Sequence, residues 1–289
     1  MSPSAYPHFF EAIALVVGAC IGSFLNVVIS RVPEGRSIVR PGSHCACGQP
    51  IAWRDNIPLL SWLALRGRAR CCGRRISVRY PLVEVLTALL FLACWRLFPP
   101  AVAVCGAILL SDLIAATVID LDHLIIPDSL TIGVAIAGLV LCLLVPSLHG
   151  EHSGIFLLDS LRSGTDGLVG LLIGSGLVLW ISVLAEAMLK KEAMGFGDVK
   201  FIGTIGVFCG WRGAVFAVFG GAVIGSAVLL GVLAGSQLRR AKPAAPEAAP
   251  MGLGTQVPFG PMLAVGGALY FLALRGPVDA WFARIGGLY

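Results

Sequence analysis

The sequence predicts an all-α, polytopic membrane protein with about eight transmembrane helices and a loop rich in Cys and Arg. Of its 289 residues, 57% are hydrophobic and only 13% are charged, and the mean hydropathy is +0.89. This composition excludes a soluble globular domain. Apolar stretches long enough to cross a bilayer recur along the chain. They lie at roughly 9–30, 80–98, 101–119, 128–148, 166–189, 199–211, 213–236 and 259–275.

The first span is expected to be retained as a helix of the bundle. It lacks the basic start and the small-residue cleavage site of a secretory signal. Its polar residues Ser23, Asn26 and Ser30 are instead typical of a helix that packs against others.

Arginine dominates the segment 31–80, with ten Arg against Glu34 and Asp55. Short loops rich in Lys and Arg stay in the cytoplasm, so this segment is predicted to be a cytoplasmic loop. The same orientation places 16 of the 21 basic residues inside and both chain ends outside. Topology and contact with anionic membrane lipid then explain the net charge of +5, and no nucleic acid partner is expected.

Four of the nine cysteines lie in this loop, and they are Cys45, Cys47, Cys71 and Cys72. Disulfides are rare in the reducing cytoplasm, so a metal site is the leading interpretation. Two groups of thiols suit tetrahedral Zn²⁺, and four thiolate ligands leave no open position for a catalytic water. The zinc would therefore be structural. Reduced free thiols and disulfides are the alternatives.

Two of the few carboxylates, Asp120 and Asp198, are predicted at the cytoplasmic ends of spans, in the runs IDLDHLIIPD and GFGDVK. Two carboxyls brought close in a poorly solvated site cannot both ionise. One can then activate water while the other protonates a peptide carbonyl, which predicts an aspartyl protease that needs no metal for cleavage. Gly195 and Gly197 let the backbone turn tightly and approach a substrate strand.

Three other acids have simpler interpretations. Asp122 would point to a different side of its helix from Asp120 and is interpreted as a solvated flank. Asp128 follows Pro127 at the start of a span, where a carboxylate caps the helix or favours its dipole. Asp112 lies in an apolar run, where we expect it to be protonated or paired within the bundle.

The runs IDLDHLIIPD and GFGDVK resemble the two signature segments of bacterial prepilin peptidases (type IV leader peptidase/N-methyltransferase), which are GxGD-type aspartyl proteases. The segments GSFLNVV, DNIPLLSW, RYPLVE and PFGP support the resemblance, which covers nearly the whole chain. By position, the catalytic pair falls on Asp120 and Asp198, with Gly195, Gly197 and Lys200 as supporting residues of the motif. The resemblance implies cleavage of the basic leader of prepilins or pseudopilins, after a Gly, at the cytoplasmic face of the bacterial inner membrane.

The resemblance also implies two regions and a second activity. Residues 1–98 would form an N-terminal membrane segment with the Cys-rich loop, and residues 99–289 would form the GxGD aspartyl peptidase domain. The second activity is methylation of the new N-terminal amine with S-adenosylmethionine, in association with the loop. The family's loop carries two CxxC pairs, whereas here the runs are CAC and CC. Aligned on Gly48 and Gly73, one missing cysteine falls on His44, which is a further candidate ligand.

Two other classes of function are weighed against the protease. A transporter or channel could use intramembrane acids to carry protons or ions, and Asp112 is the residue that favours it. The border position of the two key carboxylates and the lack of a visible inverted repeat count against it. A non-catalytic scaffold could bind a partner through the basic loop, but the intact pair Asp120 and Asp198 argues against lost activity.

Overall fold

The computed structural model describes residues 7–190, 194–239 and 258–286. These residues form helices and loops, without a strand. The long helices are α1 (Pro7–Arg31), α3 (Arg79–Leu97), α4 (Pro100–His123), α5 (Asp128–Leu144), α6 (Phe156–Leu189), α7 (Phe196–Arg239) and α8 (Gly260–Leu269). Shorter elements are η2 (Trp53–Asn56), α2 (Leu60–Ala64), η3 (Pro146–Leu148), the π-helical η4 (Tyr270–Leu274) and α9 (Arg275–Gly286).

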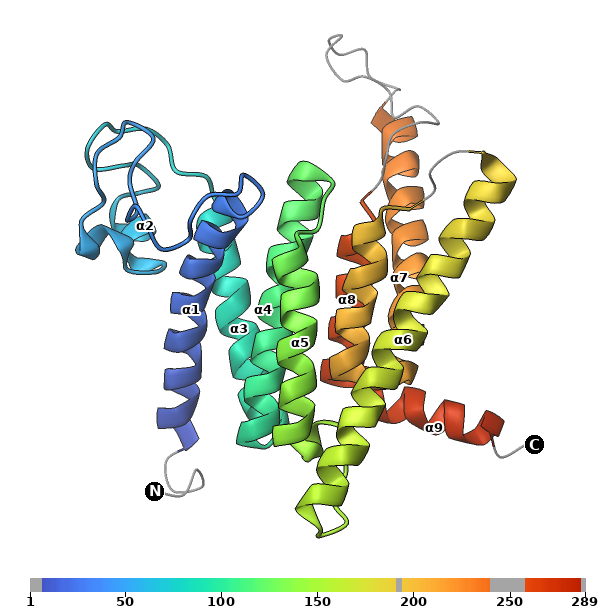
Figure 1. Cartoon of the computed structure of the whole chain (residues 1–289). Coiled ribbons are helices and arrows are strands. Elements are labelled where there is room, and N and C mark those ends of the chain that lie inside the picture. Colours follow the sequence, from blue (N-terminus) through green and yellow to red (C-terminus); the bar gives the residue numbers. More distant parts are fainter. Residues whose placement is uncertain (1–6, 191–193, 240–257, 287–289) are drawn as a thin grey trace.

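The long helices stand side by side in a bundle (Figure 1). Residues 32–78, with η2 and α2, lie together at one end of α1 and α3, and we call them the Cys-rich loop. We call this end of the bundle the loop side. The helix α9 lies across the opposite end, where α1 also begins.

The prediction of an all-α, polytopic membrane protein is confirmed. Among the described residues, six helices are long and apolar enough to cross a membrane, and α5 is a shorter apolar helix of 17 residues. The predicted spans 9–30, 80–98 and 101–119 correspond to α1, α3 and α4. The number of crossings depends on α5, on the turn inside α7 and on the continuation of α8 into α9, so the count of eight stays a prediction.

The helix α7 consists of two helices that meet at Gly210, which has φ 69° and ψ 177°. A Cβ atom at Gly174 of α6 would lie 3.0 Å both from the Ile202 carbonyl oxygen and from the Ala214 Cβ. In one straight helix these two residues would be about 18 Å apart along the axis. The chain therefore reverses at Gly210, as the separate spans predicted at 199–211 and 213–236 require (Figure 1). Only glycine adopts this backbone conformation without strain.

The helix α4 lies at the centre of the bundle and is the most buried of the candidate spans. On one side it packs with α1 and α3 through a small apolar cluster that includes Leu25, Val83 and Ile119. On the other side a larger cluster joins it to α7 and α8, with Leu109, Phe208 and Leu263 fully buried. Packing on both sides fixes the depth and the rotation of α4, and with them the positions of its two buried acids.

Candidate active site

Asp120 lies in the last turn of α4, on the loop side. The helix ends at Leu124, whose left-handed backbone (φ 54°) is accompanied by a hydrogen bond from its N–H to the Asp120 carbonyl oxygen. The Asp120 side chain is buried, with the residue 5% exposed. Its Oδ2 accepts a hydrogen bond of 3.1 Å from the Gly260 N–H at the start of α8. Asp120 is therefore held between two helices that are 140 residues apart in the sequence.

Asp198 lies in the first turn of α7, also on the loop side. Its N–H donates a hydrogen bond of 3.0 Å to the Gly195 carbonyl oxygen, which closes the GFGD turn. The residue is 9% exposed. The preceding Gly197 approaches Ile126 closely, since a Cβ at Gly197 would lie 3.4 Å from the Ile126 Cβ. The glycine thus allows the start of α7 to pack on the turn that connects α4 to α5.

The two carboxyls belong to one site. Ile126 contacts both halves of it, because a Cβ at Gly260 would also lie 3.1 Å from the Ile126 Cδ1. Asp120 and Asp198 are close enough to interact electrostatically. Within residues 7–190, 194–239 and 258–286, no Lys, Arg or His forms a salt bridge with either of them. Two buried carboxyls without a cation cannot both ionise, so the site can supply one acid and one base.

Gly260 is the residue whose role sequence reasoning missed. Its segment PFGP carries the family resemblance, but no local pattern says that it reaches Asp120. A Cβ at Gly260 would lie only 2.7 Å from the Asp120 Oδ2. The absence of a side chain at this position is therefore what lets its N–H approach the carboxyl.

Lys200 pairs with a third acid and forms no salt bridge with Asp120 or Asp198 in the described part of the chain. Its Nζ forms a salt bridge of 2.5 Å with the Asp128 Oδ1 and lies 5.2 Å from the centre of the Phe196 ring. The pair ties the start of α7 to the start of α5. Asp128 makes no capping hydrogen bond, and the N-cap of α5 is Pro127. The prediction that the Asp128 carboxylate caps α5 through a hydrogen bond is therefore wrong. The residue does lie in the first turn, where its charge favours the helix dipole.

Asp122 is partly exposed, as expected of a flank, but it is not simply solvated. Its Oδ2 forms a salt bridge of 2.5 Å with Arg79 at the start of α3. Arg79 also donates a hydrogen bond of 3.3 Å to the Val118 carbonyl oxygen of α4. This pair ties α3 to α4 on the loop side, away from the Asp120 carboxyl.

Asp112 lies two turns below Asp120 on α4 and is 4% exposed. Neither of its carboxyl oxygens has a hydrogen-bond partner among the described residues. The residue lines an apolar groove of about 590 Å³ over α1, α3, α4 and α5, with Phe24, Leu25 and Leu130 among the other lining residues. Of the two states expected for Asp112, pairing within the bundle is absent from the described part of the chain.

The four loop cysteines come together in space. Their sulfur atoms all lie within 4.8 Å of one another, with 3.6 Å between Cys45 and Cys72 and 3.4 Å between Cys47 and Cys71. Four thiolates about 2.3 Å from a tetrahedral zinc ion lie about 3.8 Å apart, so the cluster fits this metal. His44 is not part of the cluster, and its Nδ1 bonds the Gly42 carbonyl oxygen at 2.9 Å.

Two matching turns build the cysteine cluster. One turn is closed by an antiparallel bridge between His44 and Pro50, and the other by a bridge between Arg68 and Arg75. Gly48 and Gly73 have φ of 85° and 68°. Each glycine follows one group of cysteines, and the two glycines occupy corresponding left-handed positions. This turn geometry brings cysteines of unusual spacing into one cluster.

One of these thiols loses its proton most easily. Hydrogen bonds from the Cys47 backbone N–H and from the neighbouring thiols lower the pKa of Cys45 to about 7. The Cys47 and Cys45 side chains raise the pKa of Cys71 to about 12 in the metal-free cluster. Cys45 is therefore the first ligand to be available as a thiolate near neutral pH.

Two family models match this chain. Residues 16–98 match the Bacterial Peptidase A24 N-terminal domain, and residues 107–230 match the Type IV leader peptidase family. The chain belongs to the type IV leader peptidase family. The prepilin leader peptidase/N-methyltransferase of Pectobacterium carotovorum subsp. carotovorum is 39% identical over 286 residues, which cover 91% of this chain and 92% of the relative.

Two further relatives carry the same name. The protein of Klebsiella pneumoniae is 38% identical over 216 residues, or 72% of this chain and 88% of the relative. That of Myxococcus xanthus (strain DK1622) is 42% identical over 234 residues, or 79% of this chain and 66% of the relative. No solved structure matches the chain.

Proposed function

We propose that this leader peptidase cleaves the leader of prepilin-like proteins with Asp120 and Asp198 as its catalytic pair. The observation that carries the proposal is the meeting of these two buried carboxyls at one end of the bundle, with no cation paired to either within the described residues. Family membership and the names of the relatives support cleavage of prepilin leaders.

The two carboxyls would divide the work of hydrolysis. The ionised member takes a proton from water as the water attacks the scissile carbonyl, and the protonated member donates to the carbonyl oxygen. The Gly260 N–H stabilises negative charge on the Asp120 Oδ2, so it helps to fix the orientation of that carboxyl. The cleavage chemistry proposed here uses the two carboxyls and water, without a metal.

The proposed substrates are prepilins or pseudopilins, which consist of a short basic leader followed by an apolar helix. Ten of the 17 Arg of the chain lie in residues 31–80, so the loop side is proposed to face the cytoplasm of a bacterial inner membrane. A substrate helix inserted in the same membrane would then present its leader boundary at the depth of Asp120 and Asp198. A glycine before the scissile bond suits this site because it leaves room beside the helix ends.

We also propose that the new N-terminus is methylated, as the names of the relatives indicate. S-adenosylmethionine would supply the methyl group. The zinc proposed at Cys45, Cys47, Cys71 and Cys72 is structural, because four thiolates complete a tetrahedral site. It would hold the two turns of the loop together, since the loop has few buried apolar residues of its own.

The transporter alternative gains no support. Asp112 is the residue that favoured it, and it lines an apolar groove without a polar partner in the described part of the bundle. A proton path needs a chain of polar groups, and this groove does not provide one.

The test is cleavage of a co-expressed prepilin, followed by mass spectrometry of the product. Asp120→Asn and Asp198→Asn each remove a titratable proton without changing volume, so each should abolish cleavage while the protein remains inserted. Full activity of either variant would remove the proposed mechanism. A cut on the far side of the substrate helix would instead overturn the orientation.

A further inference from the structure

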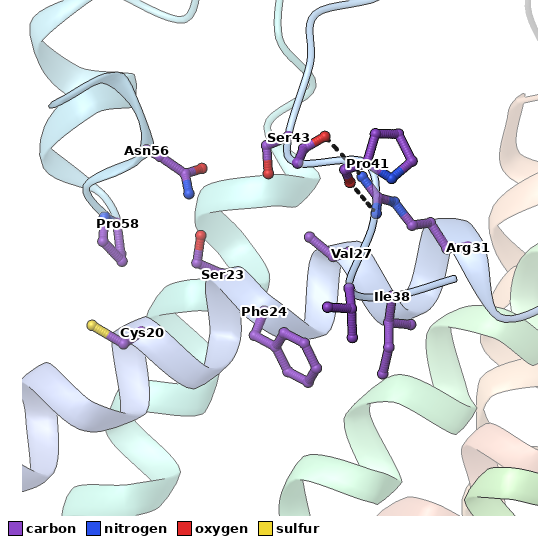
Figure 2. A pocket seen from close by; sticks show the side chains of 12 residues that line it. Cys20, Ser23, Phe24, Val27, Arg31, Ile38, Pro41, Ser43, Asn56 and Pro58 are labelled. Atoms are coloured by element: carbon purple, nitrogen blue, oxygen red, sulfur yellow. Dashed lines mark hydrogen bonds between the residues drawn. The ribbon is translucent and has the colours of Figure 1, made fainter. Parts of the chain in front are cut away.

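A cavity of about 370 Å³ separates α1 from the Cys-rich loop, on the loop side of the bundle (Figure 2). Ser23, Phe24 and Val27 of α1 form one wall, and the loop near Ser43 and Asn56 forms the other. Cavities that bind small molecules measure roughly 300 to 1,000 Å³, so this one has the size of a ligand site.

Buried charged side chains fix both loop segments that form the far wall. Arg31, at the end of α1, donates three hydrogen bonds to loop carbonyls, the shortest of them 2.7 Å to the Pro41 oxygen. Glu84 of α3 is buried and accepts a hydrogen bond of 2.8 Å from the Leu59 N–H, close to Asn56 in the sequence. Burying a charge is costly unless it is well bonded. These two anchors therefore hold the loop in a defined position above α1.

Exposed or partly exposed polar side chains that make no hydrogen bond to another described residue face this cavity. The side chains of Ser23, Ser43 and Asn56 line it, and none of them makes a hydrogen bond to another described residue. Figure 2 shows the Ser23 hydroxyl and the Asn56 amide directed toward each other across the space. Phe24, Val27 and Ile38 supply an apolar side. The lining thus combines free hydrogen-bonding groups with an aromatic and aliphatic surface.

The cavity also borders the membrane. Phe24 lines both this cavity and the apolar groove over α1, α3, α4 and α5. A molecule in the cavity therefore lies next to a surface that faces lipid, on the same side of the bundle as Asp120 and Asp198. An amine at the end of an apolar helix can reach such a position without leaving the membrane border.

We propose that this cavity binds the methyl donor, an S-adenosyl sulfonium compound. The proposal rests on the methyl transfer proposed above. Ser23, Ser43 and Asn56 suit the ribose hydroxyls and the amino-acid end of such a molecule. The apolar side with Phe24 suits its purine ring.

The reaction served by the cavity balances without a further reagent. The substrate's amine nitrogen takes the methyl group as the carbon–sulfur bond breaks, and the electron pair of that bond stays on sulfur to leave a neutral thioether. The proton released from the amine goes to solvent. The contribution of this chain is to hold the donor at the membrane border where the new amine is formed.

Binding of radiolabelled S-adenosylmethionine to the full-length protein in nanodiscs tests the proposal by equilibrium dialysis. The double variant Ser23→Ala, Asn56→Ala removes two hydrogen-bonding groups and should weaken binding about tenfold or more. The matched control is Ser30→Ala on the same helix, because that hydroxyl bonds the Val27 carbonyl oxygen and lies outside the cavity. Ser23→Trp should abolish binding by filling the space. Gel filtration and circular dichroism check that each variant is folded.

The outcomes test the assignment of the donor to this cavity separately from the methyl transfer activity. Crosslinking of the labelled donor by ultraviolet light should modify peptides from residues 20–31 or 38–58. If the wild type binds and methylates while the double variant binds equally well, the cavity assignment is overturned and methyl transfer stands. If the wild type neither binds the donor nor yields methylated product, both fail. Displacement of the donor by anionic lipid but not by S-adenosylhomocysteine would assign the cavity to a headgroup.

Discussion

Replacing Gly260 with Ala should disturb Asp120 without changing any ionisable group. The new Cβ would lie 2.7 Å from the Asp120 Oδ2 and 3.1 Å from the Ile126 Cδ1. Favourable contacts between such atoms begin near about 3.5 Å, so the carboxyl must move by roughly 0.5 to 0.8 Å. A misplacement of about 1 Å can cost 10²-fold in rate. We therefore expect kcat/KM for leader cleavage to fall roughly 10- to 100-fold, or about 1.4 to 2.7 kcal/mol in the barrier.

The assay is the time course of prepilin cleavage in proteoliposomes, normalised to the amount of inserted enzyme. Gly133→Ala is the matched control, because a Cβ at this position of α5 meets nothing within 4 Å. Alanine in place of a helical glycine stabilises by about 0.5 to 1 kcal/mol, so this variant should accumulate normally and cleave at the wild-type rate. A wild-type rate for Gly260→Ala would show that Asp120 does not act from the position described. Equal losses in both variants would point to a general effect on the bundle.

Three further predictions concern the neighbouring acids and the loop cysteines. Asp122→Asn and Asp128→Asn should each retain most cleavage in the same assay, because each removes one side of a partly exposed ion pair worth at most about 1 kcal/mol; loss of cleavage in either would give that acid a catalytic role. Elemental analysis should find about one Zn²⁺ per chain in the wild type and in His44→Ala, and none when the four loop cysteines are replaced with Ser; metal-free wild type would favour free thiols. Because the pKa of Cys45 is lowered to about 7 and zinc binds the thiolate, zinc affinity should fall as the pH drops through about 7.

The helices and the positions of the two aspartates at helix ends could be predicted because both depend on local patterns. Apolar stretches define spans, and Asp120 and Asp198 each lie at the end of one. The contact between Asp120 and Gly260 joins positions 140 residues apart, and the pair of Lys200 and Asp128 joins positions 72 apart, so no local pattern contains either. Packing between helices decides such contacts.

The cysteine cluster forms although the spacing of its cysteines in the sequence does not favour it. Its spacings are unusual for zinc, yet the left-handed turns at Gly48 and Gly73 bring the thiols together. Spacing alone describes the chain between two ligands, whereas the backbone conformation decides where their side chains point. The same turns leave His44 outside the cluster, which spacing could not show.

The shortness of α5 has a consequence for the lipid around the site. From Phe196 to Cys209 the first half of α7 has only 14 residues, a length of about 21 Å, and the 17 residues of α5 measure about 26 Å. Both are shorter than the hydrocarbon core of about 30 Å. Residues 198–209 of α7 are mostly buried, so it is the exposed face of α5 that meets lipid, and thinning of the bilayer there costs a fraction of a kcal/mol per Å of mismatch. Hydrophobic mismatch thereby lowers the headgroup layer toward Asp198, and a leader boundary that enters this region reaches water at a depth that would elsewhere be hydrocarbon.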